Sequence, residues 1–167
     1  SRVPLQILGQ SGCKLQFPKC NIYLDPYLSN SVQELDSPDL ERLQPIPFLP
    51  ESVTDADKVL ITHEHIDHCD PHTIPKLAKA SPQAKFICPQ PVYVKLIEWG
   101  IDESRIILAS EVWTELDENL SLLAIAAAHP DIVRDKDGNL ACVGYLIKYF
   151  DQVIYLAGDT CVKQEII

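Results

Sequence analysis

An apolar run, Lys58-Val59-Leu60-Ile61, leads directly into a segment that holds three imidazoles and the carboxylate of Asp67, Thr62-His63-Glu64-His65-Ile66-Asp67-His68. The run has the length and the β-branched, apolar character of a strand that is buried on both faces. The chain leaves this predicted strand at Thr62. The polar segment therefore lies where a buried strand meets a loop.

We interpret this segment as part of a site for two metal ions. Residues two apart in extended backbone point the same way, so His63 and His65 can bind one cation. Asp67 and His68 follow after the chain has turned and can reach a second cation. Imidazole and carboxylate suit zinc, manganese or iron, and dinuclear sites hold their ions about 3.5–4 Å apart. The alternative, isolated surface or core histidines with Asp67 as a helix cap, explains the cluster less well.

The length and composition bound the other possibilities. The 167 residues, 46% of them hydrophobic, predict one globular domain with a real core. No apolar run approaches the roughly 18–20 residues of a membrane span, and the amino-terminal residues lack the layout of a signal peptide, so we expect no membrane association. Because the chain contains no methionine, we expect a processed product or a piece of a longer chain.

The formal net charge of −10 argues against a nucleic-acid partner, because such binding depends on Lys and Arg neutralising phosphates. A small anion held by metal ions is compatible with that charge. The six cysteines form no C-x-x-C pair, and this favours reduced thiols and a cytoplasmic location over a disulfide framework. They are Cys13, Cys20, Cys69, Cys88, Cys142 and Cys161.

Around the histidine segment, the pattern changes from strands alone to strands alternating with helices, which predicts a mixed α/β fold. The predicted strands are 5–8, 13–17, 21–24, 58–61, 84–88, 105–108, 112–116, 120–127, 141–150 and 153–157. The predicted helices are 71–80, capped by Asp70 with Pro71 in its first turn, and 92–99, closed by Gly100.

Residues 27–52 have no periodicity and several prolines, and we expect a long active-site loop there. Arg42 is a candidate for binding an anionic group. A surface crossover without any ligand role is an equally good interpretation of this segment.

Four strand ends together resemble the metallo-β-lactamase superfamily. The pattern His-x-His-x-Asp-His follows the strand 58–61, His129 follows 120–127, Gly158-Asp159-Thr160 follows 153–157, and Asp25 follows 21–24. The resemblance implies an αββα sandwich over residues 1–167 that is apparently incomplete at its carboxyl end. The apolar strands of the second sheet would then lack a covering layer, so we expect an oligomer or part of a longer chain.

The resemblance also implies a ligand set. One ion would be bound by His63, His65 and His129, and the other by Asp67, His68 and a bridging Asp159. Asp25 would hold the histidine segment without binding metal, and Asp67 would also orient the attacking hydroxide or pass its proton. The superfamily takes a last histidine for the second ion from a later half, which this chain does not offer, so we expect the second ion to bind weakly.

Within the superfamily, Glu98-Trp99-Gly100-Ile101 and Arg105-Ile106-Ile107 most resemble the L-ascorbate-6-phosphate lactonase-like branch. The implied function is a metal-dependent hydrolase that uses a bridging hydroxide on a lactone or phosphoester of a small anionic metabolite. One alternative is a metal-binding remnant or subunit without turnover. Another is a nuclease of the same fold, which the negative charge disfavours.

Overall fold

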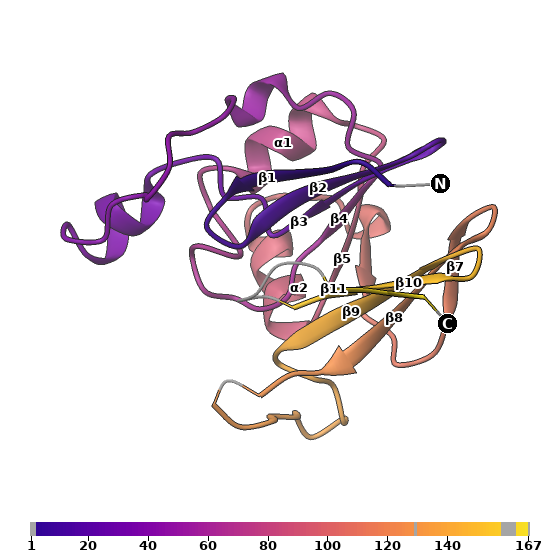
Figure 1. Ribbon diagram of the computed structural model, residues 1–167. Coiled ribbons are helices and arrows are strands. Elements are labelled where there is room, and N and C mark those ends of the chain that lie inside the picture. Colours follow the sequence, from indigo (N-terminus) through magenta and orange to yellow (C-terminus); the bar gives the residue numbers. More distant parts are fainter. Residues whose placement is uncertain (1–2, 129, 158–162, 167) are drawn as a thin grey trace.

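The computed structural model describes residues 3–128, 130–157 and 163–166, which form two sheets and two helices (Figure 1). Sheet A contains β1 (Leu5–Gly9), β2 (Gly12–Phe17), β3 (Cys20–Leu24), β4 (Lys58–Leu60), β5 (Lys85–Cys88) and β6 (Ile106–Leu108) in that order. Sheet B has the order β11 (Lys163–Ile166), β10 (Gln152–Leu156), β9 (Val143–Tyr149), β8 (Leu120–Ala126) and β7 (Thr114–Asp117). The helices are α1 (Ile74–Ala80) and α2 (Gln90–Glu98), with short helical turns η1 (Val32–Asp36), η2 (Pro50–Ser52) and η3 (Glu103–Arg105).

The direction of the strands determines which strand ends meet. In sheet A, β1 to β3 are antiparallel, whereas β3, β4, β5 and β6 are parallel; α1 connects β4 to β5, and α2 lies in the connection from β5 to β6. Sheet B is antiparallel throughout. Because β8 and β10 both pair with β9, they run in the same direction and end on the same side of sheet B.

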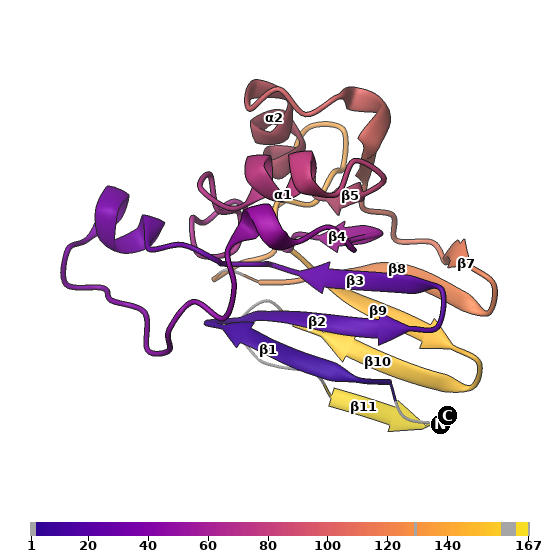
Figure 2. The same cartoon turned by 90° about the horizontal axis from the view of Figure 1, so that it is seen from above.

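Two apolar layers hold the fold together. One lies between sheet A and the two helices and includes Val59 and Phe86 on the sheet and Leu77 and Leu96 on the helices. The other lies between the two sheets, so sheet A is buried on both faces (Figure 2). This arrangement confirms the predicted fold class, because the described residues supply an α-layer, a β-layer and a second β-layer.

The outer face of sheet B has a different environment. Its side chains alternate with those of the core between the sheets, and Leu123, Ile125, Leu146 and Val153 are partly exposed. No helix among the described residues covers this face. An aliphatic surface of this kind is rarely left open to water in a stable assembly.

Helix α1 and strand β11 differ from the elements that the sequence predicted. Helix α1 begins at Ile74 and has Pro75 in its first turn, so the prediction of a start at Pro71 was wrong. The reason is a separate turn after Asp70, whose carbonyl accepts hydrogen bonds from the amides of Thr73 and Ile74. Strand β11 was not expected from the sequence, and it adds an edge to sheet B by pairing with β10.

The segment 27–52 is a long excursion that includes η1 and η2 (Figure 1). Arg42 anchors it to the body of the protein. The guanidinium donates hydrogen bonds to the carbonyl oxygens of Leu8, Tyr27 and Gln44 and lies over the Tyr27 ring. The interpretation of Arg42 as a residue available to an anionic group is wrong, because its N–H groups already donate to main-chain carbonyl oxygens and hold the segment 27–52 in place.

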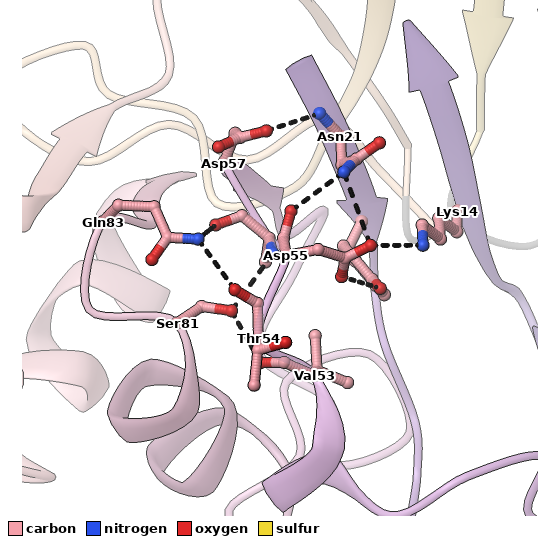
Figure 3. A network of polar contacts seen from close by, with 10 residues as sticks. Lys14, Asn21, Val53, Thr54, Asp55, Asp57, Ser81 and Gln83 are labelled. Carbon is pink, nitrogen blue, oxygen red and sulfur yellow. Dashed lines mark hydrogen bonds and ion pairs between the residues drawn. The ribbon is translucent and has the colours of Figure 1, made fainter. Parts of the chain in front are cut away.

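The approach to β4 is fixed by a polar network at its amino end (Figure 3). The Asp55 carboxylate accepts hydrogen bonds from the Lys14 ammonium and the Tyr23 hydroxyl, both at 2.6 Å. The Asp57 carboxylate accepts a hydrogen bond from the backbone N–H of Asn21 at 2.8 Å, and the Ser81 hydroxyl donates one to the Val53 carbonyl oxygen. Burial raises the pKa of Asp55, but the bonds from Lys14 and Tyr23 outweigh it and lower the pKa overall. This network ties the segment before β4 to β2, β3 and the end of α1.

Candidate functional site

The histidine loop, defined as residues 62–68, lies at the carboxyl end of β4, beside the carboxyl end of the parallel strand β3. In this position it follows the general rule that sites in open α/β sheets form at the carboxyl ends of parallel strands. The Asp25 amide donates to the Leu60 carbonyl at 2.9 Å, so the residues that follow the two strands remain side by side. The fold thus brings Asp25 to the start of the histidine loop.

The Asp25 carboxylate binds both ends of the histidine loop, at Thr62 and at His68. One oxygen accepts a hydrogen bond from the Thr62 amide at 2.8 Å. The other lies 2.6 Å from the Thr62 hydroxyl and 2.7 Å from His68 Nδ1. Asp25 is fully buried and has a φ of 41°, a left-handed conformation that Asp tolerates better than most residues. Burial raises the pKa of Asp25, and the hydrogen bonds from His68 and Thr62 oppose this shift.

The imidazoles lie close to one another. The ring centroids of His63 and His68 are 4.0 Å apart, and those of His63 and His65 are 4.8 Å apart. His63 and His68 are buried, whereas His65 is exposed. His63 Nδ1 lies 2.9 Å from the Thr62 hydroxyl, and His68 Nε2 lies 3.4 Å from a carboxylate oxygen of Asp67. The loop therefore gathers nitrogen and oxygen donors within a few ångströms.

This donor set fits a divalent transition metal. Because the buried Asp25 carboxylate accepts from Nδ1 of His68, that nitrogen carries the proton and Nε2 is left with a lone pair. A carboxylate behind a ligand histidine is a common arrangement in metal sites and orients the ring. Within the described ranges, however, no three His, Cys, Asp or Glu side chains are gathered as a complete metal site.

Two of the expected ligands, His129 and Asp159, lie outside the described residues, so their roles stay predictions. The strands that precede them end next to the histidine loop. β8 ends at Ala126, which pairs with Val143 at the start of β9, and the Val143 amide donates to the Thr62 carbonyl at 2.9 Å. β10 ends on the same side of sheet B. The described ends of β8 and β10 therefore lie on the same side of sheet B as the start of β9, which contacts the histidine loop.

The long loop is joined to the end of the histidine loop through Asp70, a residue that the sequence analysis treated only as a helix cap. The buried Asp70 carboxylate accepts hydrogen bonds from the hydroxyls of Ser29 and Thr73, and the Thr73 hydroxyl accepts one from the Leu28 amide. These hydrogen bonds hold the start of the segment 27–52, which contains η1, next to the end of the histidine loop.

A pocket of about 420 Å³ opens between η1 and the histidine loop. Val32 and Asp36 line one side, and residues 64–67 and Lys95 line the other. The Lys95 ammonium, on α2, donates to the Glu64 carbonyl at 3.2 Å and lies 3.7 Å from the Glu64 carboxylate. Lys95 was not singled out from the sequence, because nothing in a helical heptad shows that its side chain reaches the loop.

The neighbouring Cys69 does not belong to this donor set. Its thiol is buried, and burial raises its pKa to about 12. A thiol that stays protonated at neutral pH is a poor ligand and a poor nucleophile. Cys69 is therefore a packing residue beneath the loop.

The residues that suggested a lactonase-like branch have structural roles. Gly100 has a φ of 84° and ends α2, as expected from the sequence. The Arg105 guanidinium donates to the carbonyl oxygens of Ala78, Ser81 and Ala84, and so holds the end of α1. Packing accounts for Gly100 and Arg105, and they do not assign a substrate.

Comparisons with known proteins agree with the fold. A family model described as the beta-lactamase superfamily domain matches residues 20–167. The protein Rv0906 of Mycobacterium tuberculosis, whose function is uncharacterised, is 27% identical over 129 residues, which cover 77% of this chain. The chain spans 34% of the length of that protein. No helix in the described ranges is long and apolar enough to cross a membrane.

Solved structures share the architecture at low sequence identity. Igni18, a metallo hydrolase of Ignicoccus hospitalis, superposes with a TM-score of 0.63 and 24% identity over 95% of this chain and 61% of its own. An isothiocyanate hydrolase from Delia radicum gut bacteria has a TM-score of 0.66 and 18% identity, covering 94% of this chain and 63% of its own. CmlA, a diiron β-hydroxylase of Streptomyces venezuelae, has a TM-score of 0.65 and 17% identity over 95% of this chain and 30% of its own.

The last two proteins carry different chemistries on one fold, so the fold alone does not assign a reaction. The family model, by contrast, extends from β3 through the histidine loop to the end of the chain. We conclude that the chain belongs to the beta-lactamase superfamily.

Proposed function

We propose that this chain is the metal-binding part of a metal-dependent hydrolase that acts on a lactone or phosphoester of a small anionic metabolite. The observation that carries the proposal is the buried Asp25 carboxylate, which joins Thr62 to His68 while three imidazoles gather beside it. Igni18 and the isothiocyanate hydrolase, which share the fold, are hydrolases, and this supports the same class of reaction. We also propose a cytoplasmic location, which the buried thiols of Cys20, Cys69 and Cys88 support.

In this proposal His63, His65 and His129 would hold one ion, and Asp67, His68 and Asp159 would hold the other. Zinc or manganese fits such nitrogen and oxygen donors best, and iron is also compatible. When bound, divalent cations lower the pKa of water to about 7 and polarise the bond that is attacked. The chain itself supplies the orientation of the rings, because Asp25 holds His68 and Thr62 holds His63.

Asp67 is the proposed proton-transfer residue. Its side chain is 39% exposed and lines the pocket, and one of its oxygens lies 3.4 Å from His68 Nε2. A carboxylate at this position can orient an attacking water, accept its proton and return the proton to the leaving oxygen. The short distance to His68 and the position of Asp67 in the pocket lining support this role.

The pocket beside η1 is the proposed substrate site, with residues 27–52 as its active-site loop. Among the described residues, Lys95 is the only lysine or arginine that lines it, and it would face the anionic group of the substrate. Asp36, Glu64 and Asp67 line the same pocket, so the pocket without metal is unfavourable for an anion. Substrate binding should therefore depend on prior loading with metal.

Two measurements on the purified protein test the proposal. The first is elemental analysis after dialysis, for which we expect about one equivalent or more of a transition metal through a three-histidine site. Less than about half an equivalent, with no uptake on titration, would contradict metal binding.

The second measurement is turnover by the metal-loaded protein on a panel of lactones and a generic phosphodiester. Asp67→Asn should retain folding and lose most of the activity, typically a 10²- to 10⁴-fold effect for a proton-transfer group. Metal uptake without turnover on any substrate would identify a metal-binding subunit instead. Cleavage confined to DNA or RNA would identify a nuclease.

A further inference from the structure

The proposed metal centre is divided between the two sheets. The histidine loop follows β4 in sheet A, whereas His129 and Asp159 follow β8 and β10 in sheet B. A centre built in this way requires the two sheets to be held at a fixed separation at this edge. Apolar contacts are non-directional and fill the space between the sheets without fixing their register. Directional contacts across the layer are therefore of particular interest.

Tyr145 makes such a contact. It lies on β9 and is fully buried, and it pairs with Ala124 on β8 and with Leu156 on β10. Its hydroxyl lies 2.7 Å from the Ile61 carbonyl oxygen and 3.1 Å from that of Ile87. Both carbonyls belong to sheet A. A single O–H thus reaches across the layer to the point where β4 leads into the histidine loop.

The sequence of β5 explains why Ile61 needs this donor. Leu60 pairs with Ile87 in parallel register, and the Ile61 amide donates to the Ile87 carbonyl at 3.0 Å. In a parallel ladder the next bond would run from the amide of residue 89 to the Ile61 carbonyl. Residue 89 is proline, which has no N–H. The Tyr145 hydroxyl supplies the donor that the ladder lacks.

The next residue is held by the same strand. The Val143 amide donates to the Thr62 carbonyl at 2.9 Å, while the Thr62 amide and hydroxyl both bind Asp25. Thr62 is therefore fixed from sheet A on one side and from sheet B on the other. The main-chain bond of Val143 could be removed only by proline, which would also disturb β9, whereas Tyr145→Phe removes the Tyr145 hydroxyl alone.

We propose that Tyr145 is a positioning residue for the metal centre. Its hydroxyl locks the carboxyl end of β4 to β9, and so sets the placement of the histidine loop relative to the strand ends that precede His129 and Asp159. This inference rests on the proposed function for its consequence in metal binding. Its structural part, the placement of the loop, holds in the metal-free protein as well.

The test compares Tyr145→Phe with a matched control, Tyr149→Phe. Both variants remove one hydroxyl from β9, but the Tyr149 ring packs on Phe17 at the other end of the strand, with centroids 5.0 Å apart. The first measurement is amide hydrogen exchange of residues 62–69 in the metal-free protein. We expect exchange in this segment to accelerate at least about tenfold in Tyr145→Phe and to stay unchanged in Tyr149→Phe.

The second measurement is metal affinity by chelator competition, with the visible spectrum of the cobalt-loaded protein as a report of ligand geometry. Tyr145→Phe should weaken binding about 10- to 100-fold, the range found when groups that support metal ligands are removed, and should alter the spectrum. Adding Pro89→Ala to Tyr145→Phe returns an N–H at residue 89, whose φ of −73° alanine can adopt, and should restore part of the affinity.

The outcomes separate this inference from the proposed function. Unchanged exchange of residues 62–69 in Tyr145→Phe would overturn the inference, whether or not metal binds. Faster exchange with unchanged metal affinity and spectrum would also overturn it, because Tyr145 would then serve only stability. Failure of the wild-type protein to bind any metal would refute the proposed function, and the exchange measurement would still decide whether Tyr145 positions the loop.

Discussion

Replacing Asp25 with asparagine tests the organisation of the histidine loop most directly. Asparagine has nearly the same shape and also tolerates the left-handed φ of 41° at this position. It has one acceptor oxygen where the carboxylate has two, and its amide nitrogen can only donate. The substitution therefore changes hydrogen bonding at a fully buried position while it leaves the packing almost unaltered.

The orientation of the new side chain follows from the partners. Its oxygen must face the Thr62 amide, because two N–H groups would otherwise meet there. The amide nitrogen then faces the Thr62 hydroxyl and His68 Nδ1. To accept this donor, His68 must move its proton from Nδ1 to Nε2, the nitrogen that would bind metal. Asp25→Asn thus converts His68 into the tautomer that cannot act as the proposed ligand.

The expected magnitudes differ for stability and for metal binding. Three hydrogen bonds to a charged group are replaced by neutral ones, and we expect a loss of about 2–4 kcal/mol in the free energy of unfolding, since each charged bond contributes about 1.5–3 kcal/mol. Metal affinity should fall about 10- to 100-fold, mainly for the ion assigned to His68.

Urea unfolding of the metal-free protein measures the first quantity, and chelator competition measures the second. The nitrogen chemical shifts of the His68 ring report which nitrogen carries the proton. The control is Asp55→Asn, which removes a carboxylate at the opposite end of β4 and should lower stability without changing metal affinity. An Asp25→Asn protein that loses stability but retains metal affinity and the original tautomer would refute the reasoning.

Three other outcomes follow from the structure. Arg42→Met should lower the free energy of unfolding, measured in urea, by about 1–3 kcal/mol, because the carbonyl oxygens that Arg42 binds lose their hydrogen-bond donor. Its metal affinity, measured by chelator competition, should stay the same. The pKa of Asp55 is lowered in the folded protein, so its carboxylate stabilises the fold above the unfolded-state pKa, and this contribution is lost as the pH falls through the lower, folded-state value. Asp55→Asn should therefore lose less stability than the wild-type protein as the pH is lowered, and acid titration followed by circular dichroism would measure this. The part-exposed aliphatic face of sheet B, which includes Leu123 and Leu146, should cause self-association, and light scattering that shows a soluble monomer of 18.7 kDa without hydrophobic-dye binding would contradict it.

The sequence alone was sufficient for the local features. The strand 58–61 and the histidine loop after it are recognisable because apolar runs and donor residues are adjacent in the chain. The alternation of strands and helices between residues 58 and 108 predicts the mixed α/β fold for the same reason. Local patterns were less reliable at the start of α1, where the Asp70 turn displaced the helix by three residues from the expected position at Pro71.

The resemblance to the superfamily pointed to Asp25, but only the tertiary structure decided which partners Asp25 binds and which other distant groups hold the histidine loop. Asp25 lies 43 residues from His68, Lys95 lies 31 residues from Glu64, and Tyr145 lies 84 residues from Ile61. No periodicity connects such pairs, because their contacts depend on strand order and on the packing of one sheet on the other. The same applies to Arg42, whose charge suggested an anion site and whose donors instead bind main-chain carbonyls. A sequence shows which side chains can donate or accept, but the fold determines the partners that they meet.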